Sequence, residues 1–317
     1  IIPAPQEFHY RNRAQFKCWM TAEGFVIGFY RAGRHYVVDT ESCLLLLPAL
    51  QRTLTLLRHA MGTAPRPDAV PQIDVTCGDD DGVQMVVHLL ADAVAEMTPW
   101  LRDLARQNDL NLSLQVGRKD SLRRIHGEND QRLDLLSVDV TLRVRPGGFA
   151  QVNPSQNRAL VETVCRLAGL SGDERVLDLF CGAGNFSLPL ARAARWVDGV
   201  EAFAPAIEDA RCNAAANRID NVAFYAEDAT EAIEQLWTED GYDLVVLDPP
   251  RSGCYPVVRE LLRRRPARII YVSCDPATLV RDLQPLVGGG YRLVESQPCD
   301  MFPQTWHIES VSLLQRS

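Results

Sequence analysis

Short apolar runs alternate with helical segments along the second half of this 317-residue chain, and this pattern most constrains the fold. From Arg175 onward the expected strands cover residues 175–180, 196–201, 222–226, 242–247, 268–273, 291–296 and 308–314. Such alternation is typical of a parallel, doubly wound sheet with helices on both faces. The loop between the last two strands is too short for a crossover helix, so we expect these two strands to be antiparallel.

The first half of the chain lacks this alternation, and we expect it to form a separate α+β domain. Its expected strands cover residues 16–19, 24–30, 35–39, 73–76, 83–89, 110–116 and 135–144. Its expected helices cover residues 48–62 and 92–108. The turn Pro146–Gly148 then precedes a helix at 153–169, with Asn153 as its N-cap. The sequence therefore predicts two domains, of residues 1–147 and 148–317.

The charge of the chain excludes one class of protein. A net charge of −8 does not suit a protein that coats nucleic acid without specificity. Residues 1–150 carry 17 Lys+Arg against 18 Asp+Glu, whereas residues 151–317 carry 16 against 23. The nearly neutral first half contains basic clusters that could follow a phosphate backbone, and their members are Arg11, Arg13, Lys17, Arg118, Lys119, Arg123 and Arg124. The alternative is that these side chains are solvated strand edges.

Cysteine usage and hydropathy predict the compartment. The nine cysteines are odd in number, scattered and without a CxxC pair, so free thiols in the reducing cytoplasm fit better than a disulfide framework. No uninterrupted apolar run is long enough to span a bilayer, and no basic and apolar leader precedes Tyr10. We therefore expect a cytoplasmic protein that does not associate with membranes.

A glycine turn follows the first strand of the second half, in the string VLDLFCGAGNFSLPLA (Val176–Ala191). Gly182 and Gly184 let the backbone approach a ligand closely, but the third glycine of the dinucleotide fingerprint is missing. Glu201 ends the next strand and suits the hydroxyls of a ribose, and Asp228 follows the third strand and could face an adenine amine. Because the turn holds no Lys or Arg for phosphates, S-adenosylmethionine fits better than a pyrophosphate cofactor.

Two further strands end in candidate catalytic groups. The string YDLVVLDPP delivers Asp248, and its two prolines stiffen the loop before Arg251. The string IIYVSCD delivers Cys274 directly before Asp275-Pro276, which opens a helix, and a thiol beside a helix amino terminus has a favoured thiolate. Ligands of open α/β sheets bind beyond the carboxyl ends of the strands. We therefore expect a thiol, a carboxylate and a cofactor turn to meet in one crevice.

The segment SCDPATLVRD (Ser273–Asp282) resembles the nucleophile motif of the RNA 5-methyluridine methyltransferases, S-adenosylmethionine-dependent enzymes that modify tRNA or large-subunit rRNA. Five other strings resemble motifs of this family and occur along the chain in the order typical of the family. They are HYRNRAQF (His9–Phe16), GFAQVN (Gly148–Asn153), DLFCGAGNF, DPPRSG and DMFPQTWHIE (Asp300–Glu309). Together they span nearly the whole chain. The resemblance implies a Rossmann-like class I methyltransferase domain with a seven-stranded, mostly parallel sheet, preceded by an α+β RNA-binding domain.

The resemblance also implies roles for individual residues. Cys274 matches the family nucleophile, which adds to carbon 6 of uracil, and Glu309 matches the base that later removes the proton from carbon 5. The candidate cofactor-binding residues are Gln151, Phe180, Gly182, Asn185, Glu201, Asp228 and Asp248. The residues expected at the substrate uracil are Gln151, Asp248 and Arg251. The chain departs from the family where Asp275 replaces a frequent asparagine and Gln304 a frequent histidine.

Many family members also have an amino-terminal β-barrel and an iron–sulfur cluster held by four cysteines. Only Cys43 matches one of these ligands, so we expect neither this cluster nor another metal in this chain.

Two alternative functions stay open, an RNA cytosine methyltransferase and an RNA-binding or assembly factor with dispensable catalysis. The cytosine enzymes place a second cysteine directly after the proline of the fourth-strand motif, where this chain has Arg251. The motifs do not distinguish rRNA from tRNA as the substrate, and they are silent on oligomeric state.

Overall fold

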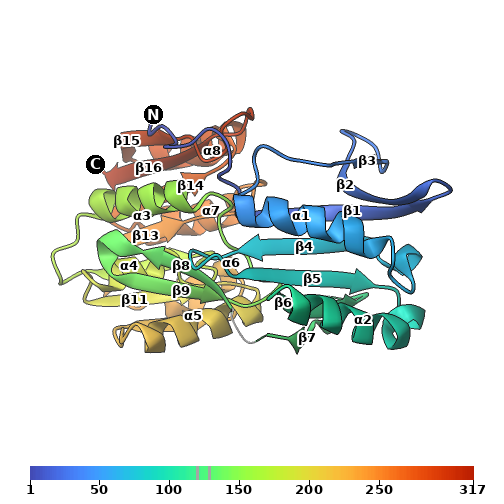
Figure 1. The fold of residues 1–317 in the computed structure, drawn as a ribbon. Coiled ribbons are helices and arrows are strands. Elements are labelled where there is room, and N and C mark those ends of the chain that lie inside the picture. Colours follow the sequence, from blue (N-terminus) through green and yellow to red (C-terminus); the bar gives the residue numbers. More distant parts are fainter. Residues whose placement is uncertain (119–120, 128–129) are drawn as a thin grey trace. The chain divides into compact units, whose positions relative to one another are not determined.

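The structure of the chain is a computed structural model that describes residues 1–118, 121–127 and 130–317 (Figure 1). The chain divides into two compact units. The amino-terminal unit contains residues 6–133 and 144–148, and the carboxy-terminal unit contains residues 1–5, 134–143 and 149–317. Lys119, a member of a predicted basic cluster, lies outside the described residues. Among the helices of the described ranges, none combines the length and the apolar character that a membrane crossing requires.

A seven-stranded sheet forms the centre of the carboxy-terminal unit, in the order β12-β11-β10-β13-β14-β16-β15. Its strands are β10 (Arg175–Leu179), β11 (Trp196–Val200), β12 (Val222–Tyr225), β13 (Leu244–Leu247), β14 (Arg268–Ser273), β15 (Tyr291–Cys299) and β16 (Glu309–Arg316). Neighbours from β12 to β14 are parallel, whereas β16 runs antiparallel to both β14 and β15. This arrangement confirms the predicted fold class, the seven predicted strands and the antiparallel last pair.

Helices lie on both faces of this sheet because the order in which the chain adds strands reverses between β12 and β13. Crossover connections of the usual right hand then fall on opposite faces before and after this reversal. On one face, apolar residues of α6 (Ala229–Leu236), α7 (Tyr255–Arg264) and α8 (Pro276–Gly288) pack against alternate strand residues. The other helices of the unit, α3 (Pro154–Ala168), α4 (Ser187–Ala191) and α5 (Ala204–Ala216), contact the strands as well (Figure 1). Strand order reverses between β10 and β13, so their carboxyl ends flank the usual ligand crevice of such sheets.

Helix starts in this unit follow local capping rules. The Asn153 side chain accepts a hydrogen bond from the Gln156 amide over 3.3 Å, and α3 ends at Gly169 in the left-handed conformation. Asp275 caps α8 by accepting from the Thr278 amide over 2.9 Å. The predicted start of α3 is therefore confirmed, and the capping carboxylate of Asp275 can replace a capping asparagine without loss of the helix start.

A second seven-stranded sheet forms the amino-terminal unit, in the order β3-β2-β1-β4-β5-β6-β7. Its strands are β1 (Arg13–Thr21), β2 (Gly24–Tyr30), β3 (Val37–Asp39), β4 (Gln72–Cys77), β5 (Val83–Leu89), β6 (Asn111–Val116) and β7 (Arg123–His126). Only the β5–β6 pair is parallel among these described neighbours. Helices α1 (Pro48–Met61) and α2 (Val94–Gln107) bury their apolar stripes in one core cluster with alternate residues of the strands.

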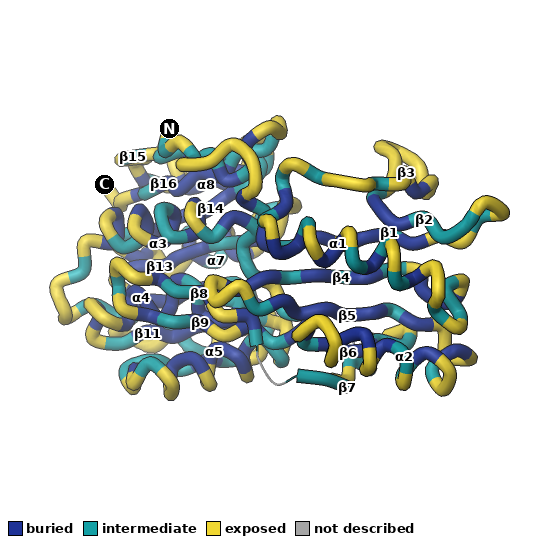
Figure 2. Tube along the Cα trace, viewed as in Figure 1, coloured by how far each residue is buried: buried dark blue, intermediate teal, exposed yellow. Residues whose placement is uncertain are grey.

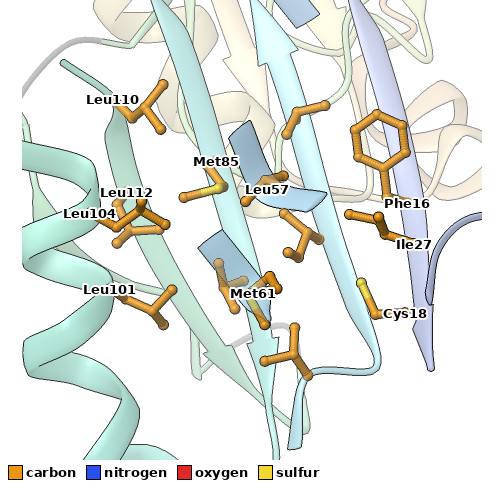
Figure 3. Packing of buried hydrophobic residues seen from close by; sticks show 14 of the residues in the cluster. Phe16, Cys18, Ile27, Leu57, Met61, Met85, Leu101, Leu104, Leu110 and Leu112 are labelled. Carbon is orange, nitrogen blue, oxygen red and sulfur yellow. The ribbon is translucent and has the colours of Figure 1, made fainter. Parts of the chain in front are cut away.

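Figure 3 shows this core, with Leu57 of α1 beside Met85 of β5 in the middle, Leu101 of α2 on one side and Phe16 of β1 on the other. Along β1 the core takes every second residue, so the intervening side chains lie on the other face of the sheet. Burial of these side chains stabilises the unit by roughly 25 cal/mol for each Å² of apolar surface removed from water.

One predicted strand is wrong. Residues 135–144 contain the last residue of β8 (Gln131–Leu135), the 3-10 turn Leu136–Val138 and the whole of β9 (Val140–Val144). Strands β8 and β9 pair with each other in a two-stranded sheet. Asp139 has a φ of 51°, a left-handed conformation that no strand residue adopts, and it reverses the chain here. The apolar pattern is nearly continuous across this turn, which is why the sequence suggests one strand. The short strand β7 has no counterpart among the predicted elements.

Candidate active site

The pairing of β14 with β16 brings the predicted nucleophile and base together. Ser273 at the end of β14 is paired with Ser310, whose Oγ donates a hydrogen bond to the Ser273 carbonyl over 3.3 Å. Cys274 follows Ser273 and Glu309 precedes Ser310, so antiparallel pairing places these two side chains beside each other. Consistent with this position, the Glu309 charge affects the pKa of Cys274.

Glu309 is 3% exposed although it is an acid. Burial raises its pKa to about 8, the nearby charge of Asp248 adds to the rise, and Arg251 opposes it. A carboxyl group whose pKa lies close to neutrality can both accept and release a proton at physiological pH. Its burial and raised pKa therefore suit Glu309 to proton transfer.

Cys274 is half-buried at the start of the β14–α8 connection. Burial raises the pKa of its thiol and the charge of Glu309 raises it further, whereas Arg251 lowers it by its charge and by a hydrogen bond. The thiol is therefore not the low-pKa group that a helix amino terminus alone predicts. Arg251, which sequence reasoning assigned to the substrate, is also the group in this site that favours the thiolate.

Asp248 connects the catalytic pair to the cofactor turn. It follows β13 and is half-buried. Burial raises its pKa to about 7, and the charges of Asp178 on β10 and Glu201 after β11 contribute to the rise. Acids from β10, β11, β13 and β16 thus interact at one edge of the sheet, as the strand ends predict.

The turn after β10 leaves room for a ligand. Phe180, Gly182 and Gly184 have φ values of 67°, 54° and 94°, and a Cβ built on Gly182 would meet no atom within 4 Å. Asp178 is fully buried, and its Oδ2 accepts from Ser187 Oγ over 2.5 Å while its Oδ1 has no hydrogen-bond partner in the described structure. Acids with no basic residue in the turn suit a cationic ligand with hydroxyl groups, so these residues fit S-adenosylmethionine.

Asn157, which sequence reasoning did not select, holds one of the predicted cofactor residues. Its Nδ2 donates to Asn185 Oδ1 over 2.9 Å, and Asn185 Nδ2 donates back to Asn157 Oδ1 over 3.0 Å. This reciprocal amide pair fixes the Asn185 side chain against the first turn of α3. The only sequence signal was the position of Asn157 four residues after the family-like Gln-Val-Asn segment.

The remaining cofactor candidates have different surroundings. Glu201 is half-buried, and its Oε1 accepts from the Phe203 amide over 2.9 Å. Gln151 is half-buried just before α3. Asp228 is exposed, and its Oδ1 caps α6 by accepting from the Thr230 amide over 2.8 Å. Glu227, which sequence reasoning missed, has a buried carboxylate oxygen without a hydrogen-bond partner among the described residues.

The loop that carries Arg251 is anchored by Asp282, another residue that sequence reasoning missed. Asp282 is fully buried on α8, and its Oδ2 accepts from the Cys254 amide and from the Tyr271 hydroxyl, both over 2.7 Å. Arg281 bonds the other carboxylate oxygen over 2.7 Å and donates to the Ser252 carbonyl over 2.8 Å. These hydrogen bonds therefore fix the end of the loop on both sides of Gly253. A buried acid among the leucines of α8 was the available signal.

The cysteines agree with the expectation of free thiols, because all nine are unpaired in the structure. Cys43 is half-buried, and its amide donates to Gln51 Oε1 over 2.9 Å. Within residues 1–118, 121–127 and 130–317, no group of three or more His, Cys, Asp or Glu side chains is arranged to hold a metal ion.

Comparisons with known proteins identify the family of this chain. The family model described as tRNA (uracil-5-)-methyltransferase matches residues 2–317. The chain is 41% identical to the 23S rRNA (uracil(1939)-C(5))-methyltransferase RlmD of Alkalilimnicola ehrlichii, over 100% of this chain and 72% of that protein. It is 36% identical to the RlmD protein of Pseudomonas fluorescens, over 98% of this chain and 67% of that protein.

A solved structure is similar over nearly the whole chain. The crystal structure of the Pyrococcus abyssi tRNA (uracil-54, C5)-methyltransferase in complex with S-adenosyl-L-homocysteine superposes with a TM-score of 0.77 at 27% identity, covering 99% of this chain and 78% of that one. These matches confirm the predicted fold, enzyme class and cofactor. The chain therefore belongs to the tRNA (uracil-5-)-methyltransferase family, whose members are S-adenosylmethionine-dependent enzymes that methylate uracil in RNA.

Proposed function

We propose that this protein methylates carbon 5 of a specific uridine in RNA through a transient covalent bond between Cys274 and carbon 6 of the uracil. The observation that carries this proposal is the pairing of Ser273 with Ser310, which sets Cys274 beside Glu309 at the ligand edge of the sheet. The charges of Glu309, Arg251 and Asp248 all act on the pKa of the Cys274 thiol. A thiol, a near-neutral acid and one cation are the groups that addition to a pyrimidine and later proton removal require.

In the first step the Cys274 thiolate bonds to carbon 6, and the electrons of the 5,6 double bond move toward carbon 5 and the carbonyl. Arg251 favours the thiolate by its charge and its hydrogen bond. Asp248, which follows β13, would hydrogen-bond the uracil ring, and Gln151 and Arg251 are its expected partners in holding the base. When bound, S-adenosylmethionine supplies the methyl group that carbon 5 accepts.

In the second step Glu309 removes the proton from carbon 5. The electron pair left behind restores the 5,6 double bond, the bond from sulfur to carbon 6 breaks, and Cys274 leaves as a thiolate. Because the pKa of Glu309 is raised to about 8, the carboxylate is a stronger base than an exposed glutamate. The proton then passes to solvent.

The residues at the turn after β10 would hold the cofactor. Phe180 and Gly182 form the open turn, Asn185 is fixed by Asn157, and Glu201 is placed for the ribose hydroxyls. Asp228 or its neighbour Glu227 would face the adenine amine, and Glu227 has the buried oxygen that still needs a donor. Membership of a uracil-5 family favours uracil over the cytosine alternative.

The identity values favour rRNA as the substrate. The RlmD relatives, which by name act on 23S rRNA, are 36–41% identical to this chain, whereas the tRNA enzyme is 27% identical. We therefore expect a uridine of large-subunit rRNA as the target and the reducing cytoplasm as the location. Residues 1–147 would bind the flanking RNA, and the target uridine must leave its stack at a cost of a few kcal/mol.

Trapping of the adduct tests the proposal. RNA fragments from 23S rRNA and tRNA, transcribed with 5-fluorouridine, cannot lose a proton from carbon 5, so the adduct should persist in denaturing gels. We expect the conjugate with the wild type and with Cys212→Ala, an exposed-cysteine control, but not with Cys274→Ala. Mass spectrometry should place the bond at residue 274. An active enzyme that forms no conjugate would refute the covalent mechanism, and the fragment that reacts identifies the RNA.

A further inference from the structure

We infer that the β3-β2-β1 edge of the amino-terminal sheet is a docking surface for single-stranded RNA that flanks the target uridine. This inference rests on the proposed function. This β1–β3 platform is formed by β1, β2 and the turn before β3, and its side chains are Lys17, Trp19, Tyr30, Arg31, Arg34 and Tyr36. Figure 2 shows the segment between β2 and β3 as exposed.

The strand periodicity separates this platform from the core. Phe16 and Cys18 are buried in the cluster beneath α1, whereas Lys17 and Trp19 alternate with them and lie on the other face. Trp19 is 64% exposed and Tyr36 is 68% exposed. The strand register pairs Trp19 with Val26 and Tyr30 with Val37, the residue after Tyr36. Trp19 and Tyr36 therefore lie toward opposite ends of β2, with Lys17 and Tyr30 between them along the strands.

Lys17 and His35 lie close to the ring of Tyr30. The Lys17 ammonium lies 5.3 Å from the centroid of the Tyr30 ring, and the His35 ring meets the same ring edge-on at 5.4 Å. Rings that stack on bases beside cations that meet phosphates are the two parts of single-strand binding sites. The rings on β1 and β2 are held by rigid strands, so little conformational entropy is lost when a base stacks on them.

The local charge points to RNA and not to a protein partner. Residues 31–36 are all exposed and contain two arginines and a histidine but no acid, in a chain with a net charge of −8. Asp39 at the end of β3 is ion-paired with Arg58 of α1, whose Nη2 lies 2.9 Å from Asp39 Oδ2, so this acid does not cancel the platform charge. On average the chain repels a polyanion, so a local positive patch decides where RNA docks.

Binding measurements with matched variants test the inference. The fluorescence anisotropy of a labelled 23S rRNA fragment gives the dissociation constant for the full chain. We expect the double variant Trp19→Ala, Tyr36→Ala to weaken binding at least tenfold, because each stacked base contributes about 1–3 kcal/mol. Trp19→Phe with Tyr36→Phe keeps the rings and should keep the affinity. Leu90→Ala, at a 49% exposed apolar residue of the same unit, is the control and should bind as the wild type does.

A charge variant gives an independent readout. Arg34→Glu should reduce the slope of log affinity against log salt concentration by about one, as expected for the loss of one phosphate contact. Arg106→Glu, on the exposed face of α2, should leave this slope unchanged. The yield of the 5-fluorouridine adduct at saturating RNA should stay at the wild-type level in all platform variants. Normal adduct formation together with unchanged RNA affinity and salt slope would overturn the platform alone. Absence of the adduct in the wild type would instead overturn the proposed function.

Discussion

Replacement of Asp282 should destabilise the carboxy-terminal unit and displace the loop that carries Arg251. Asp282→Ala removes the acceptor of the Tyr271 hydroxyl and of the Cys254 amide, two groups that are buried at 1% and 4% exposure. Within the described residues, the Tyr271 hydroxyl also accepts a hydrogen bond from the Cys254 thiol over 3.5 Å, and this sulfur could replace Asp282 only as a weak acceptor. Each buried group left without a partner costs about 1–3 kcal/mol, so the expected loss in free energy of unfolding is about 4 kcal/mol.

Thermal and urea unfolding measure this loss. For a unit of this size about 4 kcal/mol corresponds to a fall in Tm of roughly 8–16 °C. Asp282→Asn keeps one acceptor oxygen for the same donors, so we expect about half of that effect. Asp220→Ala, at an exposed acid of the same unit, is the control and should change the free energy of unfolding by no more than about 0.5 kcal/mol.

Activity separates positioning from stability. At a temperature where both Asp282 variants are fully folded, Asp282→Ala should still lower kcat, because Arg251 lies on the loop that ends at Cys254 and acts on Cys274. A loss of stability below 1 kcal/mol in the alanine variant would show that other groups satisfy Tyr271 and Cys254. Unchanged kcat would show that the loop keeps its position without Asp282.

Three further predictions concern the site itself. Glu309 has a pKa of about 8 when folded and about 4.3 when unfolded, so the folded state holds the extra proton and stability should fall as the pH rises between these values. Urea unfolding at several pH values in this range should show a smaller fall in the free energy of unfolding for Glu309→Gln than for the wild type. An equal fall in the two proteins would contradict a pKa of Glu309 raised by burial. With RNA that contains ordinary uridine, Glu309→Gln should accumulate the methylated covalent complex in denaturing gels, and rapid turnover by this variant would exclude Glu309 as the base. Asn157→Ala should weaken S-adenosylmethionine binding about 3- to 10-fold by calorimetry, since it frees the Asn185 side chain, and unchanged affinity would show that other contacts hold Asn185.

The fold of the carboxy-terminal unit could be predicted because its signals are local. An apolar run of four to six residues followed by an acid or a glycine turn identifies β10, β13 and β14 without any knowledge of their neighbours. The same runs end at Asp248 and Cys274, so the position of these two residues at one edge of the sheet was predictable too. The break at Asp139 was not, because a single left-handed residue inside an apolar pattern leaves the hydrophobic period almost intact.

The supporting residues of the site could not be predicted from local pattern, because their roles depend on partners far along the chain. Asn157 meets Asn185 across 28 positions, and Asp282 meets Cys254 across another 28. In isolation, Asn157 is a polar residue in a first helical turn and Asp282 is an acid beside an arginine. Only the packed structure turns them into an amide pair and a buried anchor, because hydrogen bonds in a buried site are decided by which elements lie together.

Backbone register, and not a contact between side chains, decides whether Glu309 can serve Cys274. The β14–β16 ladder fixes Ser273 opposite Ser310, so the next residue on each strand falls at the same end of the ladder. A slip of one residue would turn the Glu309 side chain to the opposite face of the sheet, away from Cys274 and from the role that we propose for it. The insertion of the last strand between β14 and β15 therefore has a chemical consequence. It pairs β16 on both sides and buries Glu309, and burial raises the Glu309 pKa to about 8, toward the range that the proposed proton removal requires.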